Sequence, residues 1–89
     1  MAENQHKLIK GYRDLTAEEI AGMNEGKALA EQVGNLCLKL REKALSMPMD
    51  TTEQRAERAE ALRWLEAGEL QAQQAFMALI RSIARPTTF

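Results

Sequence analysis

The chain has 89 residues, enough for one domain with a modest core. Charged residues make up 28%, aromatic residues 4%, and there are two prolines, a composition that favours long helices over sheet. The formal net charge of −1 excludes a global attraction to DNA or to anionic membranes, so neither is an expected partner. A site for an anionic ligand would have to be made by locally placed Lys and Arg side chains.

The only cysteine is Cys37, which excludes an intrachain disulfide and fits a reducing compartment. Residues 1–8 are polar and lack the apolar segment of a signal peptide. No apolar run approaches the length of a membrane span. We therefore expect a cytoplasmic protein.

The first predicted element is a polar lead-in over residues 1–15, with a short helix expected near residues 4–10. Thr16 and Glu19 have the spacing of a capping box, in which each side chain accepts a hydrogen bond from the other residue's backbone amide. This signature predicts that a helix begins at residue 17, and the proline-free sequence continues it to residue 46.

Residues 47–50 predict a turn, and Asp50-Thr51-Thr52-Glu53 is a second capping-box signature. A second helix is expected over residues 51–84, because Pro86 disfavours helical geometry at Arg85. Residues 86–89 form a short tail. The sequence thus predicts one all-α domain over residues 1–89: an antiparallel hairpin of two long helices with a short N-terminal segment.

Both predicted helices carry more apolar surface than one hairpin can cover. In the first, the apolar positions spread over an arc of roughly 200°, whereas packing against one partner needs only about 100°. These positions are Ile20, Met23, Leu29, Ala30, Val33, Leu36, Cys37, Leu38 and Leu40. In the second helix the main stripe is Leu62, Leu65, Ala72, Phe76, Leu79, Ile80 and Ile83, with Leu70 and Met77 on another face and Trp64 on a third. We therefore expect an obligate homo-oligomer.

The sequence contains little that would support catalysis. The only histidine, His6, lies in the lead-in, and Cys37 falls among apolar residues, as a small core residue would. No His, Cys and carboxylate residues have metal-ligand spacing, and no glycine-rich phosphate loop is present. We expect no enzyme, no bound metal and no cofactor.

Three features point instead to a binding site. Lys27 lies within the apolar arc of the first helix, where it either extends to the edge or meets an anion. Arg63 lies beside the secondary stripe of the second helix, where it forms an interface ion pair or binds an anion. The tail ends in Thr87, Thr88 and Phe89; it is either a frayed end or, with Tyr12, a source of hydroxyls for phosphate and rings for base stacking.

At these residues the sequence resembles a known family, the phage anti-CBASS sponges for cyclic oligonucleotides. The similarity begins with Tyr12-Arg13-Asp14-Leu15-Thr16, Glu19-Ile20, Met23-Asn24 and Lys27. It continues with Arg63-Trp64, Leu70-Gln71, residues 76–81 (FMALIR) and Pro86-Thr87-Thr88-Phe89. It extends from about Gly11 to the last residue.

The resemblance implies a helical hairpin that assembles into a homohexamer in the cytoplasm of an infected bacterium. Such proteins sequester cyclic dinucleotides, such as cyclic GMP-AMP, without degrading them. The family's essential Tyr and Lys correspond to Tyr12 and Lys27, and its pocket-closing residues to Pro86, Thr87, Thr88 and Phe89. A separate site for cyclic trinucleotides, such as cyclic triadenylate, would use Arg63. The family's accompanying Thr is absent there, since this chain has Ala28 and Leu29.

Two other classes of function remain open on sequence grounds. A helical scaffold, such as a phage assembly or antirepressor factor, would explain the wide apolar arcs but not Lys27 among apolar neighbours. A phosphodiesterase acting on the same messengers would need the metal or paired histidines that the sequence lacks. Ligand-dependent thermal stabilisation distinguishes the scaffold, and chemical recovery of the ligand distinguishes the phosphodiesterase.

Overall fold

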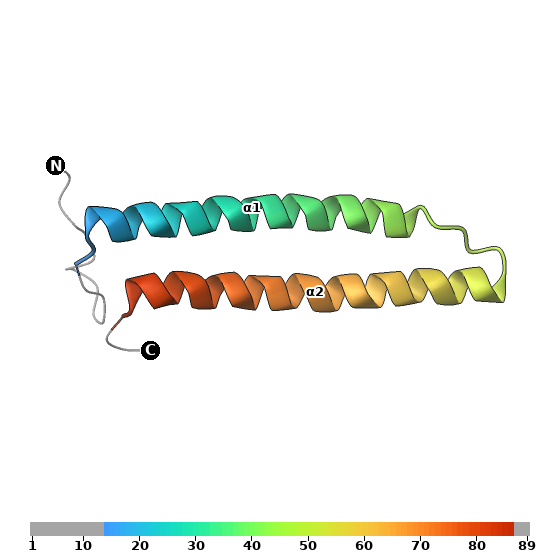
Figure 1. The fold of residues 1–89 in the computed structure, drawn as a ribbon. Coiled ribbons are helices and arrows are strands. Elements are labelled where there is room, and N and C mark those ends of the chain that lie inside the picture. Colours follow the sequence, from blue (N-terminus) through green and yellow to red (C-terminus); the bar gives the residue numbers. More distant parts are fainter. Residues whose placement is uncertain (1–13, 87–89) are drawn as a thin grey trace.

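The computed structural model describes residues 14–86. Helix α1 spans Ala17–Leu45, and helix α2 spans Thr52–Ala84. The two helices lie side by side and antiparallel, so the start of α1 and the end of α2 meet at one end of the molecule (Figure 1). We call this the open end, and the turn between the helices marks the loop end. The predicted all-α hairpin is confirmed, while the predicted short helix at residues 4–10 lies outside the described residues.

Each helix begins at a threonine that forms a complete capping box. The Thr16 hydroxyl accepts from the Glu19 amide at 3.1 Å, and Glu19 Oε1 accepts from the Thr16 amide at 2.9 Å. The second box lies one residue later than the sequence signature suggested: Thr51, not Asp50, is the N-cap, and Gln54 replaces Glu53 as its partner. Threonine and aspartate both cap helices well, so neighbouring caps compete.

Two glycines of α1 lie against isoleucines of α2 near the open end. A Cβ added at Gly26 would lie 2.9 Å from Ile80 Cδ1, and one at Gly22 would lie 3.4 Å from Ile83 Cδ1. Farther along, Arg41 Nη2 donates to Glu69 Oε1 at 2.9 Å and joins the helices by an ion pair. The hydrogen bond and the charge of Glu69 raise the pKa of Arg41. These contacts fix the register of the hairpin, with Gly26 level with Ile80.

The hairpin has very little interior. Among the described residues, only Cys37, Ala44 and Ala84 are buried. The radius of gyration is 19.0 Å, whereas a compact domain of this length has one of about 12 Å. The accessible surface is 7292 Å², and a compact monomer of this mass exposes roughly 5,200 Å².

Many large apolar side chains are exposed. Between 42% and 71% of the surface of each of the following remains exposed: Ile20, Leu29, Leu36, Leu38, Leu40, Leu45, Met49, Trp64, Leu70, Met77 and Leu79. On α1 they flank the contact with α2 on both sides. Leu36 and Leu38, for example, are about 200° apart around the helix axis. The hairpin therefore presents two apolar faces.

Candidate ligand groove at the open end

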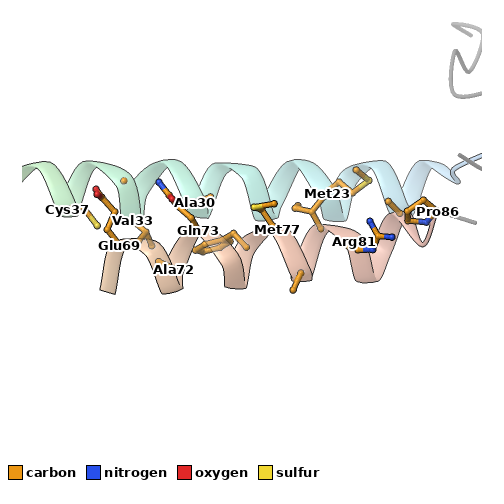
Figure 2. A pocket seen from close by; sticks show the side chains of 15 residues that line it. Met23, Ala30, Val33, Cys37, Glu69, Ala72, Gln73, Met77, Arg81 and Pro86 are labelled. Atoms are coloured by element: carbon orange, nitrogen blue, oxygen red, sulfur yellow. The ribbon is translucent and has the colours of Figure 1, made fainter. Parts of the chain in front are cut away.

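An apolar groove of about 780 Å³ runs between the helices towards the open end. Met23, Ala30, Val33 and Cys37 line it from α1, and Ala72, Gln73, Met77 and Arg81 line it from α2, with Pro86 beyond the end of α2 (Figure 2). Figure 2 shows Arg81 and Pro86 close together at one end of the groove and Glu69 near the other. The groove thus has an apolar floor with charged groups towards its two ends.

A second groove, of about 570 Å³, lies in the loop half of the hairpin. Leu40 and Lys43 line it from α1, Met47 from the turn, and Trp64 and Gly68 from α2. Trp64 and Gln73 are about 180° apart around α2, so the two grooves open on opposite faces. Both grooves reach the middle of the hairpin, where Cys37 and Ala72 border each of them.

Lys27 is exposed on α1. At 100° per residue it lies between Met23 and Ile20 in direction, and Met23 and Gly34 both line the open-end groove. Lys27 therefore lies beside this groove, next to the α1 residues that line it, without lining it itself. The sequence placed Lys27 beside apolar residues, and the hairpin puts an extended cavity next to them.

Arg63 is exposed on α2, in the loop half. Gly26 is level with Ile80, so Arg63 is displaced from Lys27 by roughly 25 Å along the hairpin at 1.5 Å per residue. Within one chain, the two cations are too far apart to contact the same small ligand. They mark two separate positions on the molecule.

Of the remaining predicted site residues, Pro86 is half-buried and lines the groove. Tyr12, Thr87, Thr88 and Phe89 lie outside the described residues. The start of α1 and the end of α2 are close together, because Arg85 Nη2 donates to Glu19 Oε2 at 3.1 Å across the open end.

The structure adds charged residues that the sequence did not single out. Arg81 lines the groove next to Pro86, and it shares a helix face with Met77 and Arg63. This alternation of cationic and apolar residues along one face was visible in the sequence. The pairing of Glu19 with Arg85 had no such signal, since it depends on how the two helix lengths match.

Neither a metal site nor a membrane span is found in the part of the chain that the structure describes. No group of three or more His, Cys, Asp or Glu side chains within residues 14–86 is arranged to hold a metal ion. No helix in the same range is long and apolar enough to cross a membrane.

Comparison with known proteins identifies the family. No protein-family model matches the chain. Anti-CBASS protein 2 of Pseudomonas phage JBD67 is 33% identical to it over an alignment of 104 positions, which covers 94% of this chain and 96% of the phage protein. This chain belongs to the anti-CBASS protein 2 family. The family expected from the sequence is therefore confirmed.

Proposed function

We propose that this protein blocks CBASS antiphage signalling in the cytoplasm of the infected bacterium by binding cyclic dinucleotides, such as cyclic GMP-AMP, and holding them intact. Family membership supports the anti-CBASS role. The observation that carries the binding site is the position of Lys27, beside an apolar groove that ends at Arg81 and Pro86. In this proposal Tyr12, Pro86, Thr87, Thr88 and Phe89 complete the pocket.

The ligand chemistry matches these groups. A cyclic dinucleotide combines two phosphates with two flat bases in one compact ring. Lysine and arginine bind phosphate by charge-assisted hydrogen bonds, and aromatic rings stack on bases. An apolar lining excludes water, which strengthens the contacts between the cations and the phosphates. A protein that outcompetes a signalling receptor needs affinity and abundance but no turnover.

The proposed pocket lies between copies of the chain, in a homohexamer. On a single hairpin the groove is open along its length, and its flanks carry the exposed apolar residues. A second copy packed against this face would cover both the apolar flank and one side of a bound nucleotide. The same assembly would bring several copies of Arg63 around a three-fold axis, where three guanidiniums could bind the three phosphates of cyclic triadenylate.

Calorimetry with cyclic GMP-AMP tests the dinucleotide site. We expect Lys27→Ala and Tyr12→Ala each to weaken binding by roughly 2–4 kcal/mol, because each removes a contact to a desolvated ligand. Lys39→Ala is the matched control: Lys39 is also an exposed lysine on α1, but it points about 120° away from Lys27. If the unsubstituted chain binds cyclic GMP-AMP and neither Lys27→Ala nor Tyr12→Ala weakens that binding, the proposed site is refuted.

The same titration separates the proposal from its rivals. A helical scaffold without a nucleotide ligand would release no heat and gain no thermal stability from any cyclic dinucleotide. A phosphodiesterase would convert the ligand to a linear product during the titration.

A further inference from the structure

Glu19 links the capping box at the beginning of α1 to the end of α2. Its Oε1 accepts from the Thr16 amide at 2.9 Å, closing the capping box of α1. Its Oε2 accepts from Arg85 Nη2 at 3.1 Å, a contact between residues 66 positions apart. Only 18% of the Glu19 side chain is exposed, against 66% of that of Arg85.

Capping alone does not require the charge of Glu19. At the start of α2 the neutral amide of Gln54 does the same work, with Oε1 accepting from the Thr51 amide at 3.0 Å. A negative charge near the N-terminus favours a helix, and Glu18 already supplies one in the first turn of α1. The charge of the Glu19 carboxylate, which capping does not need, is what pairs with Arg85.

Arg85 adopts a backbone conformation that favours glycine. It lies in the left-handed region, with φ 41° and ψ 61°, and its amide donates to the Arg81 carbonyl at 2.7 Å. Glycine or asparagine usually occupies this position at the end of a helix, because other side chains are strained there. Arginine occupies this position despite that strain, and its guanidinium contacts Glu19.

We propose that Glu19 and Arg85 form a positioning pair for the ligand pocket. The pair fixes where the chain leaves α2 relative to where it enters α1, and so holds Pro86 at the end of the groove. This inference rests on the proposed function, since the groove that Pro86 lines is the proposed ligand site. Because the Arg85 end of the pair is largely exposed, the pair contributes little to folding; its effect falls on how long the nucleotide is held.

Stopped-flow dissociation of cyclic GMP-AMP, combined with thermal melting, tests the pair. Glu19→Gln keeps the capping oxygen, as at Gln54, and removes the charge. Arg85→Gly removes the guanidinium and relieves the backbone strain. We expect both to release the nucleotide about fivefold faster, with an unchanged or higher melting temperature for Arg85→Gly. Arg85→Lys should restore slow release.

Two further measurements separate the ion pair from general loosening. The double variant should release no faster than either single variant, because both remove the same contact. The difference between Glu19→Gln and the unsubstituted chain should shrink towards zero at 1 M salt, where an exposed ion pair is screened. Additive effects, a salt-independent difference, or a lower melting temperature for Arg85→Gly would overturn the positioning role.

The outcomes distinguish this inference from the proposed function. Unchanged release in Glu19→Gln and Arg85→Gly, with binding lost in Lys27→Ala, overturns the positioning pair and leaves the binding site standing. An unsubstituted chain that binds no cyclic GMP-AMP overturns the proposed function, and the positioning role falls with it.

Discussion

Replacing a single leucine on either face of the hairpin should break the assembly. Leu36 and Leu38 are only two residues apart, but they project to opposite flanks of α1, and 52% and 57% of their surfaces are exposed in the single chain. A closed ring of more than two copies uses two surfaces of each subunit, whereas a two-fold dimer uses one. The pair of substitutions Leu36→Gln and Leu38→Gln therefore tests each face separately.

The magnitude follows from the exposure of these residues. Covering a leucine completely contributes about 1.5–3 kcal/mol, so covering the exposed half of Leu36 contributes about 1 kcal/mol per copy. Burying the unpaired amide of glutamine in its place costs about 1–3 kcal/mol more. A total near 3 kcal/mol per copy corresponds to roughly a hundredfold weaker association.

Multi-angle light scattering at micromolar concentration measures the result. We expect the unsubstituted chain to form a homohexamer, and Leu36→Gln and Leu38→Gln each to dissociate into smaller species. Lys39→Gln, an exposed neighbour on the outer surface of α1, should keep the full mass. A stable, folded monomer of 10 kDa from the unsubstituted chain would refute the reasoning. Dissociation by only one of the two leucine substitutions would limit the assembly to a dimer.

Three further predictions concern the sites and the helix contact. Deleting residues 87–89 should accelerate release of cyclic GMP-AMP without loss of helicity; equal release rates, measured by stopped flow, would mean that these residues do not close the pocket. Arg63→Ala should abolish any binding of cyclic triadenylate in calorimetry and leave cyclic GMP-AMP binding unchanged, and the reverse pattern would disprove a separate site. Gly26→Ala should be less stable than Gly34→Ala by about 0.5–1 kcal/mol in thermal unfolding, the cost of moving the end of the Ile80 side chain, since a Cβ at Gly26 meets Ile80 Cδ1 at 2.9 Å whereas one at Gly34 meets nothing within 4 Å; equal stability would contradict this contact.

The helices could be predicted from the sequence because their ends are encoded locally. Thr16 and Glu19 define one start, and Pro86 stops the second helix through a steric effect on its neighbour. The start of α2 was misplaced by one residue because Gln54 accepts from the amides of both Asp50 and Thr51, at 2.9 and 3.0 Å. Which of the two residues caps the helix depends on the path of the turn, which helix propensities do not encode.

The sequence predicted individual site residues but not how they are arranged in space. Lys27 stands out in the sequence because a cation among apolar neighbours needs an explanation, and the same holds for Arg63. Their separation along the hairpin follows from the register, which the contact of Gly26 with Ile80 sets. The contact of Glu19 with Arg85 could not be foreseen, because it requires the start of one long helix to meet the end of another and a left-handed residue at that end.

Recovery of the bound nucleotide tests the central claim most directly. The protein is incubated with cyclic GMP-AMP, separated from free ligand, denatured, and the released nucleotide is identified by mass spectrometry. The proposed function predicts that cyclic GMP-AMP is retained by the unsubstituted chain, is lost from Lys27→Ala, and is recovered unchanged. Recovery of a linear product, or equal retention by both proteins, would contradict it.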